Sequence, residues 1–295
     1  MALHHHTPRL AATEEAVTVL FCLIDDAYRF LNPRGDRYGT LKRLSDSEVV
    51  TLALVQQLRG TESQRAFLRD AERLFSHLFP GVVGLAPSSL HRRVRKLRRF
   101  LEPLRREVVA ELVGDPETLI VDSTLLAVLH PRQVNRSAGF YGAAWVRWGS
   151  FSVYGVKLHL LCAATNRVPL CYELTAANVA EVKLVEELLG AAGLGEDLGR
   201  RLLGDLAYRS EALEDALAET GISLVTERSR QHGKRQQVEI ALASLKREFR
   251  LGETLATTLV GLATRIAAKV TAYTYAFLVN RMLGRPQGHI KELWA

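Results

Sequence analysis

The sequence predicts a mixed α/β fold in which an all-helical region precedes a region built on a mixed β-sheet. Two observations predict it. Residues 14–113 carry apolar side chains at steps of three and four, the helical period, whereas short β-rich runs alternate with helical segments beyond residue 116. A Gly-Asp-Pro break lies between them, at residues 114–116. The 295 residues suffice for two domains, so we divide the chain into domains at 1–115 and 116–295.

The composition is that of an ordinary globular protein. Hydrophobic residues make up 47% of the chain and charged residues 24%, which excludes a disordered chain or a collagen-like fibre. Three cysteines, with no closely spaced pair, argue against a disulfide scaffold and a zinc site. The formal charge of +7 agrees with a polyanionic partner, but its meaning depends on where the charge lies.

The helical region contains a strongly basic helix. A capping box at residues 45–48 begins one helix, an amphipathic segment follows at 62–79, and residues 87–89 begin a third helix. That helix has an apolar stripe opposite six basic residues without an acid among them. A short helix, a turn and a basic helix are typical of a helix-turn-helix domain; the alternative is a solvated basic surface. We expect DNA contacts from Arg92, Arg93, Arg95, Lys96 and Arg99.

The second region predicts five strands, at residues 117–124, 151–165, 168–175, 200–208 and 222–227. The first three form a meander, and helices at 181–193 and 210–221 separate the later ones. A helix at about 235–249 and a long C-terminal helix end the chain. This order predicts a mixed sheet.

The long C-terminal helix is apolar enough to raise the question of a membrane span. Residues 255–279 would cross a bilayer in length, but Arg265 and Lys269 lie near the middle on one helical face, where burial in lipid is costly. We therefore expect an amphipathic helix that covers the sheet. The N-terminus lacks the apolar stretch of a signal peptide, so we expect a soluble cytoplasmic protein with no membrane partner.

Three carboxylates follow or adjoin predicted strands. Asp122 ends the apolar run 119–121, Asp205 ends the run 202–204, and Glu239 lies in the first turns of the helix after the last strand. Carboxylates that converge at strand ends can hold Mg²⁺, and two ions can activate an attacking oxygen and stabilise a leaving one. Alternatively, each Asp caps the turn that follows its strand. Two such ends in neighbouring strands favour the metal site.

Residues 123–172 contain no acidic residue. The predicted loop between the first two strands places arginines among aromatic residues, a pattern that can hold phosphates and stack on exposed bases. The alternative is a mobile loop whose aromatic side chains pack on the sheet. The candidate DNA contacts of this loop are Arg132, Arg136, Arg147, Trp145 and Trp148.

The sequence resembles the DDE transposases of bacterial insertion sequences, most closely the small insertion-sequence 982-type group. Four pieces carry the resemblance: VDST around Asp122, GVKLHL at 155–160, LTAANV at 174–179 and GDLAY around Asp205. A fifth is the family's Tyr-Arg-Glu-Lys spacing, which Arg235, Glu239 and Lys246 match, with His232 at the Tyr position.

This resemblance implies a ribonuclease H-like catalytic domain in which Asp122, Asp205 and Glu239 bind two Mg²⁺ ions, with Mn²⁺ as a substitute. It also implies that Arg235 and Lys246 contact transposon-end DNA and that His232 takes the place of a phosphate-binding Tyr. Lys157 and His159, in the GVKLHL piece, are further candidates for holding phosphates.

The resulting hypothesis is a cut-and-paste DNA transposase that acts in the bacterial cytoplasm, associated with the nucleoid. Its partners would be double-stranded DNA, namely terminal inverted repeats and target DNA, and by analogy a second copy of the chain in the DNA complex. Two alternatives stay open: a metal-dependent nuclease of the same fold, and a helix-turn-helix DNA-binding protein without catalytic activity.

Overall fold

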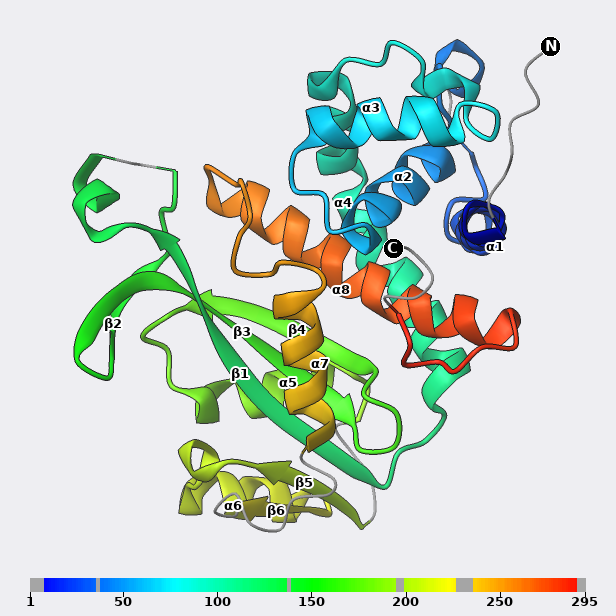
Figure 1. Cartoon of the computed structure of the whole chain (residues 1–295). Coiled ribbons are helices and arrows are strands. Elements are labelled where there is room, and N and C mark those ends of the chain that lie inside the picture. Colours follow the sequence, from blue (N-terminus) through cyan, green and yellow to red (C-terminus); the bar gives the residue numbers. More distant parts are fainter. Residues whose placement is uncertain (1–7, 36–37, 137–138, 195–198, 227–235, 291–295) are drawn as a thin grey trace, which may run out of the picture. The chain divides into compact units, whose positions relative to one another are not determined.

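A computed structural model of the chain describes residues 8–35, 38–136, 139–194, 199–226 and 236–290 (Figure 1). It divides into two compact units. The helical unit comprises Met1–Val108, Glu248–Leu255 and Thr264–Ala295, and the sheet unit comprises Val109–Arg247 and Ala256–Ala263. Most of the C-terminal helix thus belongs with the N-terminal helices, which differs from the division predicted at residue 115.

The helical unit contains five long helices. Their bounds are α1 (Pro8–Leu31), α2 (Asp46–Leu58), α3 (Gln64–Phe75), α4 (Pro87–Val113) and α8 (Leu259–Met282), of which the last residues of α4 and the first of α8 lie in the sheet unit. The predicted capping box is confirmed: Ser45 caps α2 and accepts from the Glu48 amide at 3.1 Å, and Glu48 accepts from the Ser45 amide. Nearly all of α2 is buried.

Two of the three cations in α8, Arg265 and Lys269, are neutralised inside the helical unit. Arg265 bonds the Glu62 carboxylate at 3.0 Å, and the fully buried Lys269 ammonium contacts the same carboxylate and the Phe249 carbonyl. Helix α8 also donates hydrogen bonds from Thr271 and Tyr275 to carbonyls of α4. From Thr264 onwards, the helix that was expected to cover the sheet is thus part of the helical unit. Among the described residues, no helix is long and apolar enough to cross a membrane.

Helices α3 and α4 are joined by residues 76–86, which include a short 3₁₀ turn at Pro80–Val82. This connection is longer than the three- or four-residue turn of a helix-turn-helix. Helix α4 extends to Val113, well past the predicted end near residue 101, and its apolar stripe is buried at Leu90, Leu97, Leu101 and Leu104. Most of the predicted basic side of α4 is exposed, although Arg105, further along the helix, is buried, so the predicted amphipathic character of residues 87–101 is confirmed.

The sheet unit contains a six-stranded mixed sheet. Its strands are β1 (Thr118–Leu129), β2 (Ala144–Trp148), β3 (Phe151–Ala163), β4 (Pro169–Ala176), β5 (Arg200–Gly204) and β6 (Ile222–Thr226). The order is β2-β3-β1-β5-β6, with β4 also paired to β3. β3 is antiparallel to β1, β2 and β4, whereas β5 is parallel to β1 and β6. This is the ribonuclease H-like arrangement, so the predicted fold class is confirmed.

Strand β2 lies in the segment predicted as a loop. It forms a two-stranded ribbon with the first half of β3, at the side of the sheet in Figure 1. The sequence did not indicate this strand because the residues of β2 are partly or fully exposed on both faces. The alternation of buried and exposed residues that marks a half-buried strand is therefore missing from β2.

Helices pack on both faces of the sheet. Helices α5 (Val185–Ala191) and α6 (Glu211–Glu219) join the buried cluster that includes Leu119 and Val121 of β1. Helix α7 (Gln236–Arg247) contacts β1 and β3 through its own buried side, which is not part of that cluster. Figure 1 shows α7 crossing the sheet. Helix α7 therefore covers the face opposite to α5 and α6.

Cys162 and Cys171 lie on the paired strands β3 and β4 and are buried, and all three cysteines are free thiols.

Candidate active site and DNA-binding surfaces

Asp122 lies within β1 and points to the face that α7 covers. Its neighbour Val121 belongs to the core cluster beneath α5 and α6, and successive strand residues point to opposite faces. The Ser123 amide donates a 2.8 Å hydrogen bond to the Asp122 carboxylate. This bond holds one carboxylate oxygen in a fixed direction.

Asp205 directly follows β5, the strand parallel to β1. Ile120 pairs with Leu203, so continuing the register by two residues places Asp205 opposite Asp122. Neighbouring strands are about 4.8 Å apart, so both carboxylates lie close together on one face. Asp205 accepts from the Ala207 amide at 2.8 Å, capping a short 3₁₀ helix. It therefore caps a turn and also lies beside Asp122.

Glu239 lies in the first turn of α7 and is exposed, next to the buried Val238. The helix that carries it covers the face to which Asp122 points. Within the described ranges, however, no group of three His, Cys, Asp or Glu residues has the spacing of a metal site. The topology thus brings Asp122 and Asp205 together and places Glu239 on the helix above them, without a preformed cluster of three.

The donor chemistry of the pair fits Mg²⁺. This ion prefers oxygen ligands and is usually held by one or two carboxylates while it keeps several waters. Two adjacent carboxylates on one sheet face satisfy that requirement, and Glu239, on the helix that covers this face, is the candidate for a third oxygen donor.

Sequence reasoning missed Tyr208, which packs against the sheet below the carboxylates. Its side chain is buried, and its ring covers Gly204, where an added Cβ would lie 3.0 Å from three Tyr208 atoms. Burial raises the pKa of Tyr208 strongly, and the negative charges of Asp122, Glu181 and Asp205 raise it further. Tyr208 is therefore a neutral phenol near these carboxylates. The GDLAY piece contains it and could have indicated it.

Glu181 was also missed. Its carboxylate pairs with the Lys157 ammonium at 2.7 Å and accepts from the Ser123 hydroxyl at 3.3 Å. Burial alone would raise the pKa of Glu181, but the hydrogen bond and charge of Lys157 outweigh it and lower the pKa. Lys157, which also donates to the Val179 carbonyl at 2.9 Å, is nearly buried. Glu181 thus bonds both Lys157 and Ser123, the residue that follows Asp122.

His159 is fully buried in β3, where it bonds Thr175 at 2.9 Å. The Thr175 hydroxyl donates to the Ala176 carbonyl, so His159 Nε2 donates to Thr175 and Nδ1 is the unprotonated nitrogen. Burial lowers the pKa of His159 to about 4. A neutral, buried imidazole does not reach a phosphate at the protein surface, so we propose a structural role for His159 in place of the phosphate contact.

The ribbon formed by β2 and β3 exposes aromatic and basic side chains. In β2, Trp145 and Trp148 are 45% and 58% exposed, and Arg147 is exposed as well. The segment before β2 adds the exposed Arg132 and Tyr141, of which Tyr141 is 91% exposed. Trp145 packs edge-on against Tyr154 at 5.4 Å between ring centroids. The alternative of rings packed on the sheet therefore holds only in part. A DNA contact by this ribbon stays a prediction.

The remaining predicted contacts divide into described and undescribed residues. Lys246 is exposed and lies seven residues after Glu239, on the same side of α7 two turns later. His232 and Arg235 lie outside the described residues. Arg136 ends the 3₁₀ helix Pro131–Arg136.

The basic side of α4 is largely exposed. Arg92, Arg95, Lys96 and Arg99 are exposed, whereas Arg93 is half-buried. Arg93 bonds the Leu44 carbonyl at 2.7 Å and Asp46 at 2.5 Å. Its guanidinium is therefore already engaged within the protein.

Comparisons with solved structures find distant likenesses to transposases. A piggyBac transposase synaptic complex with hairpin DNA is 13% identical, with 97% of this chain and 78% of that chain covered and a TM-score of 0.45. A Mos1 transposase paired-end complex with the left transposon end is 11% identical, with 78% and 77% covered and a TM-score of 0.27. No curated protein matches the chain.

The family comparison covers more than half of the chain. Residues 113–275 match the family described as "Transposase DDE domain". The match includes β1, β5 and α7, the elements that carry the three carboxylates. The chain therefore belongs to the family of transposases with a DDE domain.

Proposed function

We propose that this protein is a DNA transposase that cuts the ends of its insertion sequence and joins them to target DNA. The observation that carries the proposal is the parallel register of β1 and β5, which sets Asp122 beside Asp205 on the face covered by α7. Membership of the DDE family supports the same assignment. Within that family, we propose the bacterial insertion-sequence 982-type group, as the sequence motifs indicate, with action in the cytoplasm on nucleoid DNA.

Asp122 and Asp205 are the proposed metal-holding residues, with Glu239 completing the site. Bound Mg²⁺ or Mn²⁺ ions supply activation of an attacking oxygen and stabilisation of the leaving oxygen in phosphoryl transfer. The Ser123 amide donates a hydrogen bond to one carboxylate oxygen of Asp122, and the Ala207 amide donates one to a carboxylate oxygen of Asp205. These bonds fix the direction of the carboxylates before DNA arrives.

Basic side chains on both units would hold the DNA. Lys246 lies along α7 from Glu239 and would contact a phosphate near the cut, together with Arg235 and His232. Arg147 and the two tryptophans of β2, together with Arg132 of the preceding 3₁₀ helix, would bind the flanking strand. The basic side of α4 would bind the terminal repeat, and two protein copies would bring two ends together.

The proposal is tested with the inverted repeats that flank the element. The protein is incubated with end-bearing duplexes, target plasmid and Mg²⁺, and products are mapped at nucleotide resolution. We expect cuts at the element's ends and covalent joining to the plasmid. Hydrolysis without joined products would favour the nuclease, and binding without any cut would favour the non-catalytic DNA-binding protein.

A further inference from the structure

Tyr208 buries a hydroxyl group inside the sheet unit. The residue is 1% exposed, and none of the described residues makes a hydrogen bond of ordinary geometry with this hydroxyl. A buried polar group without a partner destabilises a fold, and in native proteins it indicates a functional role or a bound water or ion. The hydroxyl of Tyr208 is therefore a candidate for a role beyond packing.

A short turn directly after β5 carries Tyr208. Asp205 caps the 3₁₀ helix Leu206–Tyr208: its carboxylate accepts from the Ala207 amide at 2.8 Å, and its carbonyl accepts from the Tyr208 amide at 3.1 Å. The Tyr208 side chain then packs over Gly204, where an added Cβ would lie 3.0 Å from three of its atoms. The capped turn and the glycine thus fix the ring beside the end of β5.

This turn lies beside the edge of β1 that faces β5. The last residue pair of the two strands joins Leu203 to Ile120, and β5 ends one residue later. Asp122 and Ser123 lie just beyond that pair, where the chain of β5 gives way to the turn. The hydroxyl of Tyr208 can therefore reach the edge of β1 at these two residues, while its ring belongs to the buried cluster under α5 and α6.

The Asp122 carboxylate turns toward the same edge. Alternate residues of a strand direct their backbone groups to the same side. The carbonyl of Glu117 accepts from the amide of Arg201 in β5, so the amide of Ser123, six residues later in β1, also faces the β5 side. That amide holds Asp122 Oδ1 at 2.8 Å. One oxygen of Asp122 thus lies at the edge beside which Tyr208 packs.

The hydroxyl of Tyr208 faces concentrated negative charge. Burial raises the pKa of Tyr208 most, and the charges of Asp122, Glu181 and Asp205 raise it further, in that order. The Ser123 hydroxyl lowers this pKa with the smallest effect, and it makes no hydrogen bond of ordinary geometry with the phenol. Tyr208 is therefore a neutral donor, and Asp122 is the carboxylate that acts on it most strongly.

We propose that Tyr208 is a positioning residue for the metal site, whose hydroxyl donates a hydrogen bond to the Asp122 carboxylate when a divalent ion is bound. This role rests on the proposed function, because it takes Asp122 to be a metal-holding residue. A neutral donor that bonds such a carboxylate fixes its direction and favours its ionised form. The hydroxyl would thereby gain the partner that it lacks within the described part of the chain, and the bond would add to the affinity for the ion.

A second buried tyrosine offers a matched control. Tyr275 of α8 is also fully buried, but its hydroxyl donates to the Leu104 carbonyl at 3.3 Å. It belongs to the helical unit, whereas Asp122 belongs to the sheet unit. Replacement of either tyrosine by phenylalanine keeps the ring and removes only the oxygen. The two variants therefore differ in whether a hydrogen bond within the fold is lost.

Thermal melting of the full chain in EDTA tests whether the hydroxyl lacks a partner. Tyr275→Phe loses a hydrogen bond, so we expect its melting temperature to fall by about 2–4 °C. Tyr208→Phe loses none and removes a buried polar group, so we expect its melting temperature to stay the same or to rise. A fall as large as that of Tyr275→Phe would show that the hydroxyl already bonds within the fold, and would overturn the proposal.

Binding of Mn²⁺ to the full chain, followed by the electron paramagnetic resonance of the free ion, tests the positioning role. Loss of an outer partner of a metal ligand costs about 10–100-fold in metal affinity. We therefore expect Tyr208→Phe to bind Mn²⁺ at least about tenfold more weakly than the wild type, and Tyr275→Phe to bind as the wild type does. The half-saturating Mn²⁺ concentration for end cleavage should rise by the same factor, with the rate recovered at saturating ion.

An Asp122→Asn protein separates this role from the proposed function. If Asp122→Asn loses Mn²⁺ binding while Tyr208→Phe keeps the wild-type affinity, the metal site stands and Tyr208 has no positioning role. If Asp122→Asn binds Mn²⁺ as the wild type does, Asp122 holds no metal, so the proposed function itself fails and the role of Tyr208 fails with it.

Discussion

The buried ion group of the helical unit gives a quantitative prediction about α8. Lys269 is fully buried, and Glu62, which is 7% exposed, faces both Lys269 and Arg265. Removal of one member of a buried pair leaves an uncompensated charge and costs about 3–5 kcal/mol, whereas replacement of the pair by apolar residues is often neutral. The two single substitutions should therefore differ from the double one.

Glu62→Gln leaves two cations without their carboxylate, so we expect a loss of about 3–5 kcal/mol in the free energy of unfolding. Lys269→Met leaves Glu62 still bonded to Arg265 at 3.0 Å, so we expect a smaller loss, about 1–2 kcal/mol. The double variant should be clearly more stable than the sum of the two losses predicts, because Glu62→Gln no longer strands a buried ammonium.

Urea unfolding followed by far-ultraviolet circular dichroism measures these differences, because α8 and its partners contribute much of the helix content. Hydrogen exchange on peptides of α8 reports the same loss locally. Equal losses for both single variants, together with a double variant whose loss is their simple sum, would refute the assigned pairing.

Three further predictions concern the sheet unit. A Cβ on Gly155 would lie 2.3 Å from the Leu126 carbonyl oxygen, so Gly155→Ala should lower the free energy of unfolding by about 3 kcal/mol. Gly190 lies in α5 with open space around it, so Gly190→Ala should raise the free energy of unfolding by about 0.5–1 kcal/mol. Thermal and urea unfolding check both values. Because the pKa of His159 is lowered from 6.5 to about 4, the unfolded chain takes up a proton first as the pH falls, so stability should drop by up to about 3 kcal/mol between pH 6.5 and pH 4. His159→Leu should remove that part of the pH dependence in urea titrations, and an unchanged slope would show that the imidazole is not buried neutral. Glu181→Gln strands its buried lysine partner, so it should lower the melting temperature and slow end cleavage about tenfold without abolishing it; full activity would exclude a positioning role.

Five of the six strands, and the adjacent positions of the two aspartates, were predictable because their signals are local. An apolar run followed by Asp marks the course of β1 and the end of β5, and the element order implies that these strands are neighbours. The capping box of α2 is likewise a pattern of four consecutive residues. Local periodicity sufficed for each of these features.

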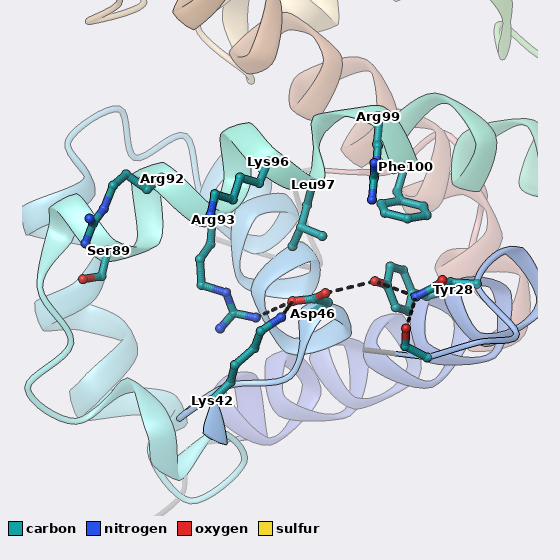
Figure 2. Close-up of a pocket in the computed structure, with 12 residues that line it drawn as sticks. Tyr28, Lys42, Asp46, Ser89, Arg92, Arg93, Lys96, Leu97, Arg99 and Phe100 are labelled. Atoms are coloured by element: carbon teal, nitrogen blue, oxygen red, sulfur yellow. Dashed lines mark hydrogen bonds and ion pairs between the residues drawn. The ribbon is translucent and has the colours of Figure 1, made fainter. Parts of the chain in front are cut away.

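Several of the features that were missed depend on partners far away in the sequence. Glu62 and Lys269 are 207 positions apart, so the placement of α8 among helices could not follow from its own pattern. Glu181 and Lys157 meet only when the 3₁₀ helix after β4 packs beside β3. The ion pair of Arg93 and Asp46 is similar, since the two residues are 47 positions apart (Figure 2).

We propose that Asp122, Asp205 and Glu239 carry out DNA cleavage. The direct measurement is the single-turnover cutting rate of end-bearing DNA in Mg²⁺ for Asp122→Asn, Asp205→Asn and Glu239→Gln, with Asp215→Asn, an exposed carboxylate of α6, as the control. We predict that each of the three lowers the rate at least about a thousandfold while DNA binding is kept, and that the control cuts as the wild type does. Cutting by the three variants at the wild-type rate would contradict the account.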